Sequence, residues 1–511
     1  MDSSNSPPTE GFHKAATVLG SPSSRFLSNP DFPQVLIVIF GLSLAKVIAD
    51  AIYNIYFHPL SKFPGPRHAA AWNLVYVYHM FRGNTVHWIE SVHKQHGEIV
   101  RIGPERLSYT KPEAWKEVYG HKTAGRKASP KDMRFLNGEA NGFNSVLTEP
   151  SDAEHGAQRR IFAHAFSDRA LSQQGELIGC YVDDLILLVH RAAAKSPTGA
   201  AELDAVKLYN FTTFDIMGDL TFSEPLGNLE NSEYSPWVTA IFHSFKAISL
   251  IRQLNEYPVL QALWKVLMPA YLKKAAMVNL QQSAERVEKR LAKERTEHPD
   301  IWALILRSGH DISREVMNAN SILFMLAGTE TTATLLSGLT YLLLKNPSKY
   351  KKLVEEVRQF KSESELTIDS VRHMKYLVAC IEEALRVYPP VPLGTFREIT
   401  RLAVVSWAAF RSPKNFKDPG LFLPERWILD EPGFEEYHAF DKREVVQPFS
   451  YGPRNCLGKN LAHYEMRAIM ARVLWNFDLE LDSQSDRWID QKSYLIWDKA
   501  ELTIRFKPRM I

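Results

Sequence analysis

The sequence has little cysteine: only Cys180, Cys380 and Cys456 occur in 511 residues, and they lie far apart. No C-x-x-C pair is present, so a structural zinc site or an iron–sulfur cluster is a poor interpretation. The small, odd number argues against a disulfide framework and fits a reducing compartment. A lone cysteine is most often a small buried hydrophobe, and the helical surroundings of Cys180 and Cys380 predict packed positions of that kind.

A charge excess of one sign is also lacking. Lys and Arg total 61 against 58 Asp and Glu, a formal net charge of +3, which leaves no electrostatic footprint for nucleic acid. The chain contains no G-x-G-x-x-G and no Walker loop, so it has no recognisable flavin or nicotinamide site of its own. No Gly/Ser tract, charge block or internal repeat interrupts residues 68–511, which predicts one large domain.

The N-terminal part of the chain differs from the rest. Residues 1–33 are polar and rich in Ser and Pro, which predicts disorder. Residues 34–56 form an apolar run long enough to span a bilayer, although Lys46 and Asp50 interrupt it and are spaced to pair on one helix face. The alternatives are an amphipathic helix on the membrane surface and a core helix. A stiff proline hinge is expected at 57–67, and the flanking charge is too even to set an orientation.

Cys456 stands in the stretch "FSYGPRNCLGKNLA", ahead of a run with helical spacing. Gly452 and Gly458 flank it and allow a tight loop that approaches a flat partner closely. Backbone N–H groups at the helix start can bond the sulfur and tune its donation to a metal. Arg454 places a cation beside an anionic group such as a haem propionate. With Phe449, these residues form the pattern F-x-x-G-x-R-x-C-x-G.

This pattern resembles the haem-thiolate loop of the cytochrome P450 superfamily, and the resemblance covers roughly residues 58–511. It implies a mainly α protein with the cytochrome P450 fold: a large helical catalytic domain at 68–511, small β-sheets and an N-terminal membrane anchor. It also implies haem b as cofactor, with Cys456 as the axial iron ligand whose donation favours O–O cleavage. The nearest resemblance is to fungal membrane-bound enzymes of secondary metabolism.

A long buried helix is predicted from "SREVMNANSILFMLAGTETTATLLSGLTYLLLKNP", with Ser313 as a possible cap. Gly328 and the carboxylate of Glu330 are unusual in such a helix, because glycine costs roughly 1 kcal/mol against alanine and a buried charge needs a partner. One reading is a kink in which threonines bond back to the i−4 carbonyls. The other is a widened turn with room for O2 and water, where Glu330 and Thr331 relay protons.

The second reading agrees with the resemblance, because the family pattern here is [AG]-G-x-[DE]-T-[TS]. The residues that match it are Ala327, Gly328, Glu330, Thr331 and Thr332.

Glu383 and Arg386 are three residues apart on a second predicted helix, and such pairs are usually worth only ~0.2–0.5 kcal/mol on a surface. The helix is otherwise apolar, so the pair is a candidate for burial with further partners. The resemblance places E-x-x-R and the arginine of P-E-R-[FW], here Arg426, in one buried network behind the haem loop. Its expected role is folding and haem retention.

Cations are expected near the haem carboxylates. His155 and Arg159 lie one helical turn apart in "HGAQRRIFAHAFS", where the family often has W-x-x-x-R and many fungal members have histidine first. A solvated basic helix start is the alternative. Arg397 is a further propionate candidate by position.

The chain departs from the family after "PPVPLGTFREIT", where a β hairpin normally precedes a segment like "VVSWAAFRSPKNFKDP". Here residues 401–403 join the two directly. A lost hairpin would leave backbone groups of its neighbour unpaired, unless the local strands pair in a shorter register. The alternative function that follows is a haem-binding remnant that is weakly active or inactive. The C-terminal "SYLIWDKAELTIRFKPR" predicts a strand pair that reaches the pocket.

The sequence therefore predicts a monooxygenase that hydroxylates or epoxidises an apolar small molecule, in a single-pass protein of the endoplasmic reticulum with a cytosolic catalytic domain. Electrons would come from a separate NADPH-cytochrome P450 reductase, docking on Lys442, Arg443, Arg454 and Lys459 unless these are merely solvated. An O2-independent isomerase or dehydratase of the same fold is disfavoured by the Glu330–Thr331 pair. Asn210, in a lone glycosylation sequon, is expected to stay unmodified.

Overall fold

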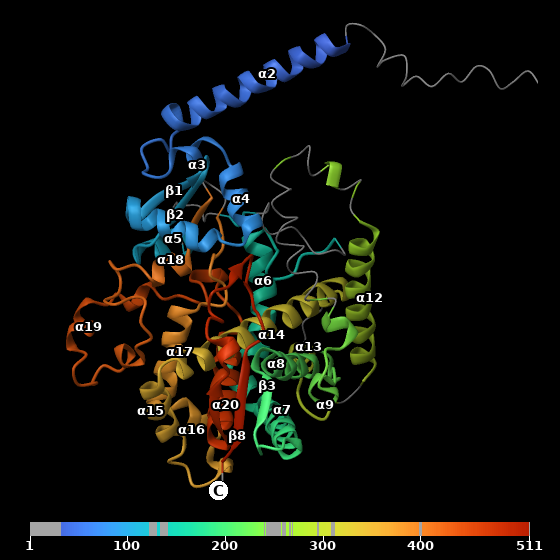
Figure 1. Cartoon of the computed structure of the whole chain (residues 1–511). Helices are drawn as coiled ribbons and strands as arrows, with labels where there is room; N and C mark the ends of the chain where they lie inside the picture. Colours follow the sequence, from blue (N-terminus) through green and yellow to red (C-terminus); the bar gives the residue numbers. More distant parts are fainter. Residues whose placement is uncertain are drawn as a thin grey trace, which may run out of the picture. The chain divides into compact units, whose positions relative to one another are not determined.

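A computed structural model of the chain describes residues 32–121, 130–132, 142–239, 241, 257, 262–264, 267, 269–293, 296–307, 312–397 and 401–509 (Figure 1). Nearly all of the segment 1–33, for which disorder was predicted, lies outside the described residues. The chain divides into two compact units, Met1–Lys62 and Phe63–Ile511. The boundary falls within the predicted hinge.

The first unit contains one long helix. Helix α2 spans Phe32–Ile52 and continues into the π-helical turn η1, Tyr53–Phe57. The stretch Ile37–Phe57 is long and apolar enough to cross a membrane, and its side chains are almost wholly exposed. Lys46 donates to Asp50 at 2.7 Å, the pairing expected from their spacing. A helix of this kind is consistent with a membrane anchor.

The second unit is mainly helical. Turns, but no helix or strand, connect Phe57 to its first helix. Its helices are α3 Arg67–Ala71, α4 Leu74–Arg82, α5 Thr85–His96, α6 Asp152–Ala163, α7 Asp168–Lys195, α8 Ala205–Phe222, α9 Asn228–Asn231, α12 Ala270–Ala292, α13 Ile301–Leu306, α14 Arg314–Leu344, α15 Pro347–Val357, α16 Ile368–Arg372, α17 Lys375–Val387, α18 Ser406–Phe410, α19 Glu435–Phe440 and α20 Lys459–Asn476.

Short 3-10 or π turns supplement these helices. They are η2 Trp115–Tyr119, η3 His164–Phe166, η4 Glu363–Glu365, η5 Pro424–Trp427, η6 Arg443–Val445, η7 Gly452–Arg454 and η8 Ser483–Ser485.

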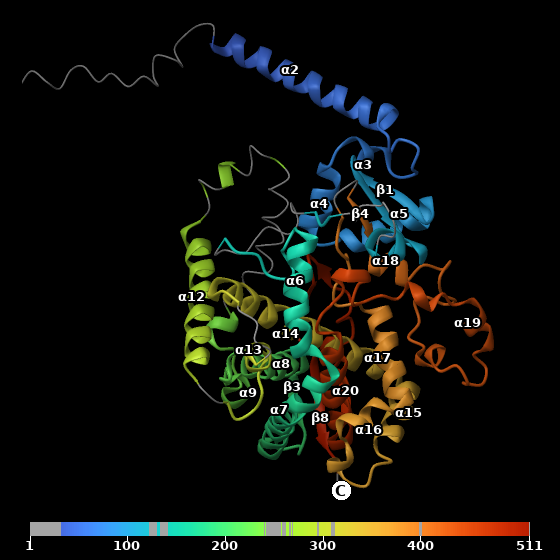
Figure 2. The ribbon, with the colours of Figure 1, turned by 180° about the vertical axis from the view of Figure 1, so that it is seen from behind.

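Helix α14 runs through the middle of the helices and contacts α8, α12, α17 and α20 (Figures 1 and 2). Its start is capped by Ser313, whose side chain accepts from the Val316 N–H, as the sequence predicts. Almost every position of its C-terminal half is buried, because apolar residues cover most of its circumference. Gly338 permits close packing there, since a Cβ would lie 2.3 Å from the ring of Tyr388.

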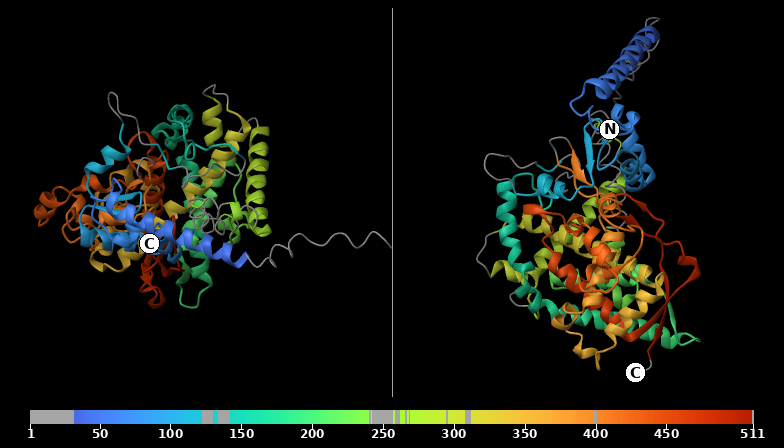
Figure 3. Two further views of the ribbon diagram at one scale, coloured as in Figure 1. Left: turned by 90° about the horizontal axis from the view of Figure 1, so that it is seen from above. Right: turned by 90° about the vertical axis from the view of Figure 1, so that its left-hand side faces the viewer.

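The described residues of this unit form three small sheets beside the helices. β1 (Ile99–Gly103), β2 (Arg106–Tyr109) and β4 (Leu402–Val404) form one, in that order. β3 (Ala201–Asp204), β8 (Thr503–Pro508) and β5 (Phe477–Leu481) form the second, in the order β3-β8-β5, at the opposite end of this unit (Figure 3). β6 (Lys492–Ser493) and β7 (Trp497–Asp498) form a hairpin, the strand pair predicted near the C-terminus.

Where the hairpin is missing, the short strand β4 pairs directly with β2, and Arg397 pairs with Leu402. β4 runs parallel to β2, with Leu402 opposite Leu107 and Val404 opposite Tyr109. Arg397 and Leu402 exchange both backbone hydrogen bonds, at 3.0 and 3.1 Å, and Arg401 turns the chain with φ of 36°. The outer edge of β2 is therefore not left unpaired, and the shorter register is the one present.

Candidate functional site

The Cys456 loop folds as the motif predicts. Turn η7 precedes it and α20 begins three residues after it. The Cys456 N–H donates to the Phe449 carbonyl at 2.8 Å. Gly452 has φ of 78°, and a Cβ there would lie 2.0 Å from the Tyr119 carbonyl oxygen, so only glycine fits. The backbone N–H of Gly458 bonds the sulfur.

The Cys456 side chain is open to solvent, yet desolvation by the surrounding protein raises the pKa of its thiol. The opposing effects come from the Gly458 hydrogen bond and from the charges of Arg159 and Lys459. An exposed but desolvated sulfur lies in a recess and not on the outer surface. A thiol in such a place becomes a thiolate when a metal takes the proton's position.

The other two cysteines differ from each other. Cys380 is buried in α17, as predicted, and burial raises the pKa of its thiol. Cys180 is exposed, so the prediction that it is packed was wrong. On α7 the neighbouring Ile178 and Val182 face the core, which turns Cys180 outward.

Five basic side chains gather beside this loop, and we call them the cation cluster: Lys131, His155, Arg159, Arg397 and Arg454. Four of them were candidates from the sequence. Arg454 donates to Asp152 Oδ1 at 2.6 and 2.9 Å and to the Glu149 carbonyl at 2.6 Å, at the start of α6.

Arg159, about two turns into α6, donates to the Asn455 carbonyl at 2.7 Å and so ties α6 to the Cys456 loop. His155 is buried, and desolvation, with the charges of Arg454, Lys131 and Arg159, lowers its pKa to about 4. It is therefore neutral near pH 7. A neutral His155 ring can still donate one hydrogen bond, so its role beside a haem carboxylate stays a prediction.

Lys131 is the member that the sequence reading missed, because no motif or spacing marks it. Desolvation and the charges of Arg454, Arg397 and Arg159 lower its pKa to about 7. Its Nζ donates to the Leu147 carbonyl at 2.5 Å. It reaches the cluster because Lys131 and Arg397 form a backbone bridge.

Arg397 is buried, lies 5.2 Å from the Tyr119 ring centroid, and its Nε has no hydrogen-bond partner among the described residues. A buried guanidinium donor without an acceptor costs free energy unless a ligand completes it. Cations that lower one another's pKa values and retain an unused donor fit a group with two carboxylates, as haem has. The residues present therefore fit the cofactor that the motif implies.

The α14 segment 327–332 is helical throughout, so the predicted widening of the turn was wrong. Close helix packing explains the glycine at position 328. A Cβ there would lie 2.7 Å from Met217 Sδ of α8, so glycine permits α14 and α8 to approach. Thr331 donates to the Ala327 carbonyl at 2.7 Å, the backbone-bonded geometry of the alternative reading. Ala327 is exposed and Thr331 half-exposed within an otherwise buried helix, which indicates internal space beside them.

Glu330 is buried and forms an ion pair with Lys499, which lies between β7 and β8. Lys499 also donates to Thr334 Oγ1 at 2.8 Å. The second carboxylate oxygen, Glu330 Oε2, has no hydrogen-bond partner among the described residues. The sequence reading missed Lys499, because nothing in the local sequence links it to α14.

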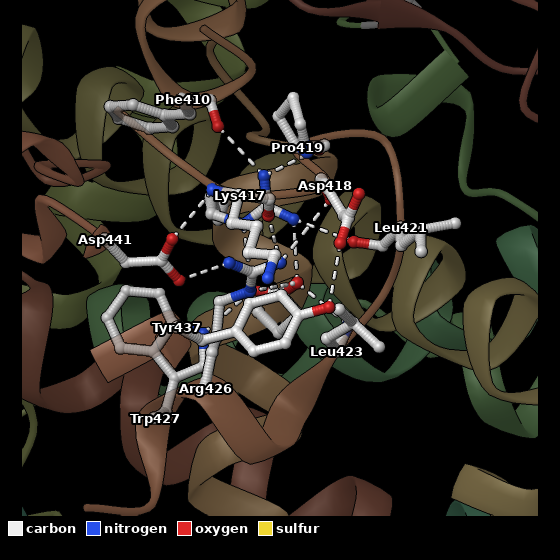
Figure 4. A network of polar contacts seen from close by, with 12 residues as sticks. Phe410, Lys417, Asp418, Pro419, Leu421, Leu423, Arg426, Trp427, Tyr437 and Asp441 are labelled. Carbon is white, nitrogen blue, oxygen red and sulfur yellow. Dashed lines mark hydrogen bonds and ion pairs between the residues drawn. The ribbon is translucent and has the colours of Figure 1, made fainter. Parts of the chain in front are cut away.

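Glu383, Arg386 and Arg426 come together in a fully buried network, as expected (Figure 4). Arg386 donates to both Glu383 oxygens at 2.7 and 2.8 Å, and Arg426 Nε reaches Oε1 at 3.2 Å. Trp427 Nε1 adds a bond to Oε2 at 2.8 Å, and Arg426 pairs with Asp441. Trp427 and Asp441 were not expected members.

Arg386 also donates to three backbone carbonyls at 2.8–2.9 Å, those of Phe410, Pro419 and Leu421. The arginine thus connects α17 to the end of α18 and to the loop between α18 and η5, which no surface i,i+3 pair would do.

One surface expectation changes, and another agrees with the structure. The Arg454 side chain is only 2% exposed, so it does not belong to a docking surface, whereas Lys459 is exposed and Lys442 and Arg443 are half-exposed. Asn210 is buried within α8, where an oligosaccharide has no room.

Comparisons with known proteins agree with this geometry. The family model for Cytochrome P450 matches residues 63–504. The cytochrome P450 monooxygenase FUM2 of Gibberella moniliformis is 44% identical, over 89% of this chain and 99% of its own length. The cytochrome P450 monooxygenase efuB of Hormonema carpetanum is 42% identical (90% and 94%), and the cytochrome P450 monooxygenase astJ of Aspergillus oryzae is 39% identical (90% and 94%).

Proposed function

Because the chain belongs to the cytochrome P450 family and is a monooxygenase of the oxidoreductase class, we propose that it hydroxylates or epoxidises an apolar small molecule in a fungal secondary-metabolite pathway. The observation that supports this most is the joint presence of the Cys456 loop and the cation cluster. Arg159 connects the two through its bond to Asn455.

The cofactor is haem, which we take to be haem b, and the Cys456 thiolate would bind its iron. When bound, haem supplies the activation of O2 and the one-electron chemistry. Arg397, Lys131, Arg159 and the neutral ring of His155 would bind its carboxylates. Arg454 orders the loop through Asp152. Phe449, Gly452 and Gly458 shape the loop that would present the Cys456 sulfur to the haem iron.

Proton handling is assigned to Glu330 and Thr331 on α14. The Thr331 hydroxyl borders the internal space beside α14 and can exchange its bond to Ala327 for one to a water. Glu330 is the nearest carboxylate along the helix and would carry protons toward that hydroxyl. Glu383, Arg386 and Arg426 hold the loops behind the cysteine and take no part in the chemistry.

Electrons would come from an NADPH-cytochrome P450 reductase, and Lys442, Arg443 and Lys459 would form part of the docking surface for its acidic face. The apolar helix α2 would anchor the protein as a single-pass protein in the endoplasmic reticulum, with the second unit in the cytosol. The proposed domain division is residues 1–33, the anchor 34–56, the hinge 57–67 and the catalytic domain 68–511.

The test uses the full chain, co-expressed with an NADPH-cytochrome P450 reductase in microsomes. Apolar candidate substrates are supplied with isotopically labelled O2, and products are examined by mass spectrometry. We expect NADPH-dependent products that contain one labelled oxygen atom. Products that rearrange or lose water without label would support the isomerase or dehydratase alternative. A protein that binds haem yet consumes neither NADPH nor O2 with any candidate would contradict the proposal.

A further inference from the structure

The ion pair between Glu330 and Lys499 joins two segments that lie far apart in the sequence. Glu330 belongs to the α14 segment proposed to move protons, while Lys499 belongs to the connection between β7 and β8. Both side chains are nearly inaccessible, at 4% and 3% exposure. A buried ion pair of this kind is costly to form and costlier to break on one side, because an uncompensated charge remains. Its presence next to Thr331 calls for an explanation.

The pair fixes the direction of the Glu330 side chain. Lys499 bonds Glu330 and Thr334 together, and these two positions are one helical turn apart on the same face of α14. Thr331 is the next residue along the helix, rotated by about 100°, and it shares its face with the exposed Ala327. Glu330 is thus bound on a different face from the hydroxyl to which it would pass a proton.

The remaining surroundings of Glu330 provide no second cation. Tyr234 and Tyr388 lie close enough that the charge of Glu330 contributes to raising their pKa values, so both remain neutral phenols. Asp498 and Glu501 flank Lys499 in the chain, but both are exposed. Among the described residues, Lys499 is the one cation in contact with Glu330, and Glu330 Oε2 keeps an unused acceptor position.

We propose that Lys499 is a positioning residue that holds Glu330 ionised and away from Thr331, so that proton delivery requires this ion pair to open. On opening, the Glu330 carboxylate takes a proton from a hydronium ion of the solvent and rotates toward Thr331. It gives that proton to the Thr331 hydroxyl oxygen while the hydroxyl passes its own proton to the water beside it. The returned carboxylate pairs with Lys499 again. This inference rests on the proposed role of Glu330 and adds the residue that controls it.

Lys499→Met tests this, because methionine fills similar space without charge. The isolated buried carboxyl should then take up a proton near neutral pH, since burial favours the neutral acid. A protonated carboxyl gives a band in infrared difference spectra, which would be recorded on the haem protein between about pH 6 and about pH 9. Other buried acids also titrate in this range, so a control variant is needed. Glu330→Gln/Lys499→Met is the matched control, and it removes the contribution of Glu465, whose pKa burial raises to about 8.

We expect Lys499→Met at neutral pH to show a protonated-carboxyl band beyond that of Glu465, and this additional band should disappear as pH rises. Wild type, Lys499→Arg and the double variant should lack the additional band. A Lys499→Met protein with a normal carbon-monoxide spectrum and no such band would overturn the proposal. If Lys499→Met does not fold, the comparison of wild type with Glu330→Gln decides: a protonated-carboxyl band at neutral pH that is present in wild type and absent from Glu330→Gln would show that Lys499 does not keep Glu330 ionised.

A second arm measures coupling with a fluorogenic alkoxycoumarin, NADPH and the reductase. Lys499→Met should release more peroxide per NADPH consumed, and raising the pH should restore coupling, whereas Lys499→Arg stays near wild type. A pH-independent ratio equal to wild type would overturn the proposal. If neither wild type nor any variant turns over this probe, that result counts against the proposed function. The infrared measurement then still decides the role of Lys499.

Discussion

Replacing Arg386 with leucine removes the central side chain of the buried network. Arg386 and Glu383 are both 0% exposed, and Arg386 donates two bonds to the carboxylate and three to backbone carbonyls. Removing one partner of a buried ion pair costs about 3–5 kcal/mol. Each buried carbonyl left without a donor adds about 1–3 kcal/mol, although these costs overlap. Against a total stability of ~5–15 kcal/mol, Arg386→Leu should remove a third or more.

The assay is urea unfolding of the haem protein at fixed protein concentration, followed by far-ultraviolet circular dichroism and by loss of the thiolate-type carbon-monoxide band. Both transitions should move to lower urea. Lys375→Leu is the control, because Lys375 and Asp430 are about three-quarters exposed and 3.6 Å apart; it should change stability by less than about 1 kcal/mol. An Arg386→Leu protein as stable as the control would refute the reasoning.

Three further predictions follow from single contacts. Thr331→Ala should keep haem but lower the ratio of product to NADPH consumed, by about 10²–10⁴-fold in the proton-transfer step; an unchanged ratio would make its bond to Ala327 a purely structural one. Gly328→Ala should lower the melting temperature, because the methyl group meets Met217. Met217 is buried, so Met217→Ala should destabilise as well, but the double variant should lose less stability than the sum of the two single changes. For apoprotein, Lys131 has a folded-state pKa of about 7, below its ordinary value, so the unfolded chain binds more protons above pH 7 and stability should rise toward pH 9. Lys131→Met should abolish that rise in urea midpoint.

The features that could be predicted from the sequence are those whose residues are near neighbours in the chain. The Cys456 loop, the Ser313 cap and the Glu383–Arg386 pair are each set by spacing within one turn or one helix. The residues that were missed act across long separations. Lys499 meets Glu330 only because the β7–β8 connection returns to α14, and Asp441 meets Arg426 through the loop before η6.

The missing hairpin is a second feature that depends on residues far apart in the sequence. The sequence alone left open whether the shortened segment would pair. The register of β4 against β2, and the turn at Arg401, depend on a strand almost 300 residues earlier in the chain. The parallel pairing of β4 with β2 supplies the backbone hydrogen-bond partners for which a longer hairpin was expected to be needed.

The ferrous carbon-monoxide spectrum of Cys456→Ala, beside those of Cys180→Ala and Cys380→Ala, tests the central claim most directly. Cys456 is the one cysteine in a recess with a backbone N–H aimed at its sulfur and with Arg159 nearby, whereas Cys180 lies on an outer helix face and Cys380 in the core. The account predicts that Cys456→Ala loses the thiolate-type band and that the other two variants keep it. A thiolate-type band of normal intensity in Cys456→Ala would contradict it.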